Sequence, residues 1–140
     1  MESLTFTDSC FMQSKGITSS IAINTQFEVL SSSTSDRRVY GFAVLSDDIG
    51  AQTVKIHLNN GVSTMQVCTV SIPASSGTNG TIATTDVFSS STGQSVFQKR
   101  VDPNGLAYFN LPAGWSILME YNTALAVTET ITTHIFGEIY

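Results

Sequence analysis

The side chains that most often do chemistry in proteins are few in this sequence and widely spaced. His57 and His134 are the only histidines, and each falls at an outward position of a predicted strand. Neither has a cysteine or carboxylate at metal-ligand spacing. Serine, histidine and aspartate all occur, but no G-x-S-x-G pattern presents a serine on a nucleophile elbow. The sequence therefore predicts solvated or interface histidines and a protein that is not an enzyme.

One acidic pair, Asp47-Asp48, lies in a polar stretch between two predicted strands. Two carboxylates with a carbonyl or two can hold Ca²⁺, but such sites use six to eight oxygen ligands. No third or fourth carboxylate is nearby in the sequence, so a solvated turn is favoured. No Gly-rich phosphate loop opens a helix, because no segment has a helical period. We therefore expect no metal ion and no cofactor.

The two cysteines, Cys10 and Cys68, are isolated and share no motif. The N-terminal residues have no basic segment followed by an apolar one, so they do not read as a secretion signal. That favours synthesis in the cytoplasm and free, buried thiols, although a disulfide between the two cysteines stays open.

The only tryptophan follows a Pro-Ala-Gly corner in "LPAGWSILMEYN" and starts an apolar run. Trp115 shares its parity with Ile117 and Met119, which places it at the margin of a buried face. A large aromatic there contributes its burial and needs one partner for the indole N–H. A structural or subunit-contact role is favoured, and a platform on which a sugar stacks is the alternative.

Charge and length exclude several classes of function. Six basic residues against 11 acidic ones give a net charge of -5, and nothing can neutralise a run of phosphates, so we expect no nucleic acid partner. No stretch approaches the roughly 18–20 apolar residues of a membrane span, so we expect no membrane partner. The 140 residues are enough for one domain with a single core.

Alternating polar and apolar residues indicate strands along most of the chain. The clearest case is 53–58, and an apolar run at 39–45 precedes it; a polar loop at 46–50 predicts that the two form a hairpin. About eight such segments follow one another at a spacing of roughly ten residues. We predict an all-β fold, a single β-sandwich or jelly roll of about eight antiparallel strands.

The N-terminal segment lacks a steady period. Residues 1–16 are predicted to be an arm with Gly16 as its hinge, and residues 17–140 to be the sandwich domain. An apolar arm would order against a neighbouring protomer or a capsid surface, most economically by strand addition. The alternative is a strand folded onto its own sandwich. The expected capsid or subunit contact residues are Leu4, Phe6, Phe11, Met12 and Trp115.

The succession of elements resembles small β-sandwich virion proteins of tailed bacteriophages. The resemblance covers Ile17–Tyr140 and is carried by "RRVYGFAVLSDD", "AQTVKIHLNNG", "VSIPASSGTNG", "LPAGWSILMEY" and "TETITTHIFGEIY". It implies a structural protein of the particle, most often a capsid decoration (cement) protein on the outside of the virion, made in the host cytoplasm. Its partner would be the major capsid protein.

Two other functions stay open. One is a head-fibre base, neck or tail-associated virion protein, with possible binding of a host glycan. The other is a cellular carbohydrate-binding or adhesion module, which the missing secretion signal disfavours. An apolar share of 41% with few charges predicts a homo-oligomer, with a trimer favoured.

Overall fold

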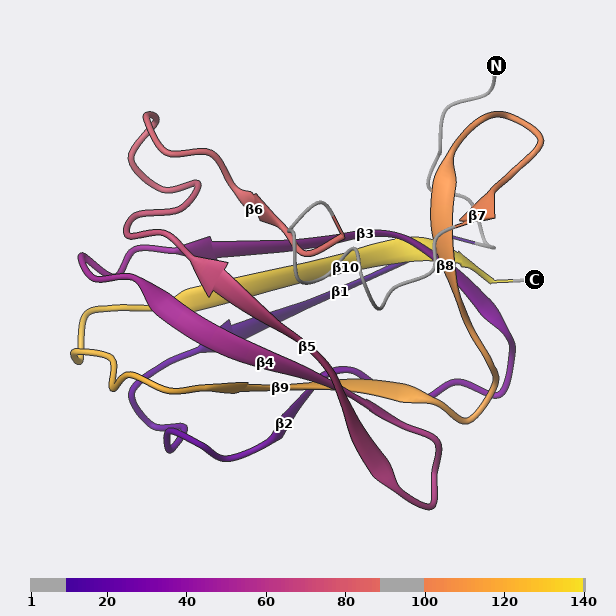
Figure 1. The fold of residues 1–140 in the computed structure, drawn as a ribbon, viewed down its shortest axis with the longest axis horizontal. Helices are drawn as coiled ribbons and strands as arrows, with labels where there is room; N and C mark the ends of the chain where they lie inside the picture. Colours follow the sequence, from indigo (N-terminus) through magenta and orange to yellow (C-terminus); the bar gives the residue numbers. More distant parts are fainter. Residues whose placement is uncertain (1–9, 89–99, 140) are drawn as a thin grey trace.

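Two antiparallel sheets pack face to face in the computed structural model, which describes residues 10–88 and 100–139 (Figure 1). The larger sheet has the spatial order β1 (Cys10–Ile17), β10 (Ile131–Ile139), β3 (Arg37–Ser46), β8 (Ala107–Leu111) and β7 (Arg100–Val101), with β6 (Thr85–Asp86) also paired to β3. The smaller sheet has the order β2 (Phe27–Leu30), β9 (Ser116–Tyr121), β4 (Gln52–Asn59) and β5 (Thr64–Ile72). The predicted all-β sandwich is confirmed, with ten strands where about eight were expected. The surplus includes two strands of only two residues.

The core lies between the sheets and follows the period-2 pattern of the sequence. In β4, Val54 and Ile56 are fully buried while Lys55 between them is exposed. Side chains alternate across the faces of a strand, so every second residue reaches the core. The largest fully buried side chains are Ile17, Leu30, Phe42, Ile56, Ile72, Leu111, Ile117, Met119, Tyr121, Ile131 and Ile135.

The predicted hairpin between residues 39–45 and 53–58 is wrong. β3 belongs to the larger sheet and β4 to the smaller one, so residues 47–51 cross from one sheet to the other. The neighbour of β4 along the chain is β5, joined by a tight turn in which the Asn60 N–H donates to the Ser63 carbonyl and Gly61 has a φ of +92°. Alternation shows which face of a strand is buried, but not which strand lies beside it.

The described part of the segment that was expected to be an N-terminal arm is a strand of the sandwich. Residues 10–16 belong to β1, which pairs with β10 from Cys10↔Glu138 to Ile17↔Ile131 and lies at the edge of the larger sheet. This is the alternative of a strand on its own sandwich. Polar Gln13 and Lys15 stand on the inward parity, which hides the alternation in the sequence. Residues 1–9, with Leu4 and Phe6, lie outside the described residues.

The two ends of the sandwich differ in the connections that form them. The loop end, on the left in Figure 1, consists of the connections 18–26, 47–51, 73–84 and 122–130. The arginine end, on the right, consists of buried Arg37 with the connections 31–36 and 112–115 that surround it.

Candidate functional site

Two of the predicted contact residues, Phe11 and Trp115, each contact Arg37 at the arginine end. Arg37 is only 4% exposed, and its Nη2 donates to the Ser31 carbonyl at 2.8 Å and to the Trp115 carbonyl at 3.1 Å. Its Cζ lies 5.4 Å from the centre of the Phe11 ring, which is cation–π geometry. Burial lowers the pKa of Arg37, but arginine starts so high that the guanidinium stays charged. One buried cation therefore ties β1, β3 and two connections together.

The corner before Trp115 is held by backbone contacts. Gly114 has a φ of +82°, and its N–H donates to the Ser33 carbonyl at 2.8 Å. The Ala113 N–H donates to Asp36 Oδ1 at 2.8 Å. Trp115 itself is half-buried and packs against the core. Its side chain is thus placed at the margin of the core, and a role in contacting a capsid or subunit stays a prediction.

The other described contact residue, Met12, points the opposite way from Phe11. Met12 is 54% exposed on the outer face of the larger sheet, where its neighbour on β10 is Phe136. The Phe136 ring lies over Gly41 of β3, at whose position a Cβ atom would be 2.2 Å from that ring. Among the predicted contact residues that the structure describes, Met12 is the exposed one, whereas Phe11 and Trp115 are half-buried.

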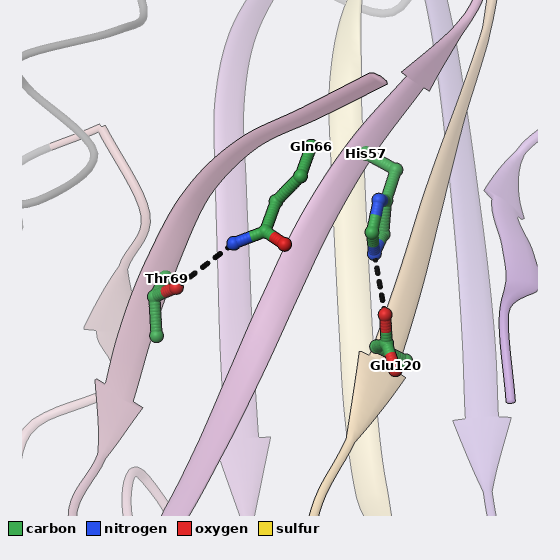
Figure 2. Close-up of polar contacts among 4 residues, drawn as sticks. All are labelled: His57, Gln66, Thr69 and Glu120. Carbon is green, nitrogen blue, oxygen red and sulfur yellow. Dashed lines mark hydrogen bonds and ion pairs between the residues drawn. The ribbon is translucent and has the colours of Figure 1, made fainter. Parts of the chain in front are cut away.

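His57 is paired with a carboxylate on the outer face of the smaller sheet. Its Nε2 lies 2.8 Å from Glu120 Oε1 on β9. Figure 2 shows the imidazole pointing at this carboxylate, while the Gln66 amide turns away toward Thr69, whose hydroxyl is 3.3 Å from it. Since a carboxylate accepts, Nε2 donates, and Glu120 fixes the orientation of the ring.

This pair departs from the sequence-based interpretation, which expected a solvated or interface histidine. His57 does face outward from the core, but it is buried. Its neighbours are Gln66 on β5 and Leu118 on β9, because a bulge between Ile56 and His57 shifts the register of β4 against β5. Cover on an outer face depends on strand neighbours, which the alternation of the sequence does not contain.

The second histidine makes a serine contact that sequence reasoning missed. Ser14 Oγ lies 2.6 Å from His134 Nδ1, between directly opposed residues of β1 and β10. On the other side of His134 the opposed residue of β3 is Ala43. Asp86 on β6 faces Ala43 in turn, and its Oδ1 accepts from the Phe88 N–H at 3.0 Å. The geometry places a cross-strand hydrogen bond between Ser14 and His134.

The acidic pair of the sequence gains a third carboxylate at the loop end. Glu129 follows the pair by some eighty positions, yet its Oε2 accepts from the Ile49 N–H at 3.2 Å. Asp48 is 6% exposed, and its carboxylate accepts from the Gly50 N–H and the Gln52 amide, both at 2.8 Å. Asp47 Oδ1 accepts from the Thr130 N–H. These carboxylate oxygens accept hydrogen bonds from N–H donors, and the cluster thereby joins neighbouring loops.

The environment of Asp48 also sets its titration. Burial on its own would raise the pKa of this carboxyl, but hydrogen bonds with the Gly50 N–H, the Gln52 amide and the Glu129 side chain outweigh burial and hold the pKa below its ordinary value. The charged form is therefore the stabilising one. Across the described residues, no group of three or more His, Cys, Asp or Glu side chains is arranged to hold a metal ion.

The two cysteines, both among the described residues, lie in different places and form no disulfide. Cys10 is half-buried on β1, whereas Cys68 is buried on β5. Burial raises the pKa of the Cys68 thiol to about 11, so it is protonated at neutral pH. In residues 10–88 and 100–139 no helix is long and apolar enough to cross a membrane.

Comparison with known proteins gives no match: no family model, no curated protein and no solved structure is similar to this chain.

Proposed function

We propose that the protein works by binding other proteins through its surface, as a structural component of an assembly. The single observation that carries this is Met12, a large apolar side chain that is 54% exposed on the edge strand β1 beside Phe136. An edge strand has backbone donors and acceptors on its outer side, and strand addition by a partner would satisfy them. An apolar side chain next to such an edge adds burial to the same contact.

The particular assembly proposed is a bacteriophage head, with the protein as a decoration (cement) protein on the major capsid protein lattice. The resemblance of residues 17–140 to phage virion sandwiches supports this choice. A homotrimer would touch several capsid subunits at once. Each interface of about 1,600 Å² would then gain from the high effective concentration of the others.

Copy number tests the proposal. Virus particles purified from cells that make the chain are analysed by quantitative mass spectrometry. Hundreds of copies per particle are expected for a decoration protein. A dozen or fewer would indicate the alternative, a head-fibre base, neck or tail-associated protein. No copies at all would overturn the virion assignment.

A surface variant tests the contact itself. Met12→Glu places a charge in the proposed interface and is expected to lower occupancy on the particles at least tenfold, while the unfolding midpoint in urea stays unchanged because the side chain is exposed. Val62→Glu is the matched control, since Val62 is 94% exposed in the β4–β5 turn. Equal occupancy of the two variants would exclude Met12 from the contact.

A further inference from the structure

The loop end presents two large aliphatic side chains almost completely to solvent. Ile49, in the β3–β4 connection, is 88% exposed, and Val127, in the β9–β10 connection, is 89% exposed. Single exposed apolar residues are common on protein surfaces and need no explanation. Two of them on turns that hydrogen bonds join to each other are less ordinary.

Each of the two residues stands at the apex of a hydrogen-bonded turn. The Gly50 N–H donates to Asp48 Oδ1 at 2.8 Å, which closes an Asx turn around Ile49. The Glu129 N–H donates to the Ala126 carbonyl at 3.0 Å, which closes a β-turn around Val127. Both apices are therefore fixed in direction before any partner arrives.

A single carboxylate joins the two turns. Glu129 Oε1 accepts from the Ala126 N–H at 2.7 Å, and Glu129 Oε2 accepts from the Ile49 N–H at 3.2 Å. A further pair of contacts ties the same loops, because the Asp47 N–H donates to the Thr130 carbonyl and the Thr130 N–H donates to Asp47 Oδ1. These hydrogen bonds hold the two turns next to each other, so the turns lose little conformational entropy when a partner binds.

The charge around this pair has one sign. The four connections of the loop end contain Asp47, Asp48 and Glu129 but no lysine or arginine. Asp47 is exposed. A second copy of the same surface would meet like charges, and a membrane of anionic lipids would be repelled. The charge complement is a basic protein surface.

We infer that Ile49 and Val127 form a paired anchor that inserts into an apolar pocket of a partner protein, at a rim carrying lysine or arginine. The exposed Asp47 carboxylate faces that rim, and the net negative charge of the loop end selects against acidic surfaces. This deepens the proposed function by naming a docking surface, and it rests on the proposed function where the partner is taken to be the capsid protein.

Site-specific photo-crosslinking in the full-length protein tests the anchor. p-Benzoylphenylalanine replaces Ile49, Val127 or, as the matched control, Val62 in cells that make the chain. Positions 49 and 127 are expected to link to one short segment of a single partner, with lysine or arginine within a few residues of it, and position 62 to link to neither. Links to a second copy of this chain, to lipid, or equally from all three positions would overturn the inference.

Affinity measurements on the partner so identified give the second readout. Val127→Asp and Ile49→Asp are each expected to weaken binding at least tenfold, and Val62→Asp to change it less than twofold. Unchanged affinity in both loop-end variants would overturn the anchor. A partner outside virus particles would defeat the phage assignment and leave the anchor standing. Particles that carry the loop-end variants at normal occupancy would defeat the anchor and leave the phage assignment standing.

Discussion

The two ends of the sandwich each bury one charged side chain, which accepts hydrogen bonds at the loop end and donates them at the arginine end. At the loop end, the Asp48 carboxylate accepts from the Gly50 N–H and the Gln52 amide. At the arginine end, the Arg37 guanidinium donates to the carbonyls of Ser31 and Trp115. In the described part of the chain neither residue belongs to an ion pair. A buried charge without a counter-ion is tolerated when hydrogen bonds replace its lost hydration.

What each end does with its apolar residues is the larger difference. The arginine end packs the Phe11 ring and the half-buried Trp115 side chain around its cation. The loop end braces its turns and leaves Ile49 and Val127 exposed. Burial stabilises the fold, whereas exposed apolar surface on a rigid frame is available to a partner. Variants of the buried residues at the arginine end should therefore act mainly on stability, and variants of Ile49 and Val127 mainly on binding.

The largest effect on stability is expected from Trp115→Ala. Removing this side chain from the core margin should lower the free energy of unfolding by about 3 kcal/mol, because buried area is lost and a cavity is left. Trp115→Phe, which keeps most of the apolar area, should lose less than half as much. Urea unfolding measures both. A stable Trp115→Ala variant that no longer binds capsid or glycan would make Trp115 a contact residue instead.

A matched pair of glycines on β1 and β10 sharpens the comparison. At Gly137, near the arginine end, a Cβ atom would lie 1.9 Å from the Arg38 carbonyl oxygen, so Gly137→Ala should cost about 2–3 kcal/mol. At Gly16, next to the loop end, a Cβ would meet nothing within 4 Å. Gly16→Ala should leave stability within about 0.5 kcal/mol of wild type. Equal unfolding midpoints for the two variants would contradict the close strand contact at Gly137.

Arg37→Met should cost about 2 kcal/mol. The methionine fills much of the volume but leaves the Ser31 and Trp115 carbonyls without their donor, and a buried acceptor that loses its partner carries its desolvation cost. Lys55→Met removes an exposed cation from β4 and serves as the control, with a change of less than about 0.5 kcal/mol. A more stable Arg37→Met protein would show that the cation strains this end.

Asp48→Asn should cost about 1 kcal/mol, less than Arg37→Met. Gln52 Nε2 donates to Asp48 Oδ2 and to the Thr123 carbonyl, while Gln52 Oε1 accepts from the Thr123 N–H, so the Gln52 amide cannot rotate to meet a new donor. Asp47→Asn keeps an acceptor for the Thr130 N–H and should cost less.

The same carboxyl gives a pH dependence of known sign. The folded state holds the pKa of Asp48 below its unfolded value, so its contribution is fully present above an unfolded pKa of about 3.9 and is lost as the pH falls toward the lower folded pKa. Comparing wild type and Asp48→Asn in urea between neutral pH and pH 3 measures it. Stability curves that stay parallel over this range would show that Asp48 titrates normally.

The sequence by itself determined the fold class and most of the strands. Alternation at 53–58 and the Asn-Gly turns follow from local rules, since side-chain period and positive φ are properties of a few consecutive residues. Even the position of Trp115 at the core margin could be read from its parity with Ile117 and Met119. The strand at residues 10–17 was not predicted, because polar Gln13 and Lys15 occupy inward positions and hide the alternation.

Only the tertiary structure decided which distant residues meet. Glu129 reaches the Asp47-Asp48 loop, Glu120 covers His57, and Arg37 gathers the carbonyls of two separate connections. β3 and β4 also lie in different sheets of the folded protein, although the sequence favours a hairpin there. The physical reason is that two strands with one apolar face each can share a core either side by side or across it. The choice depends on the packing of the whole chain, which no local pattern records.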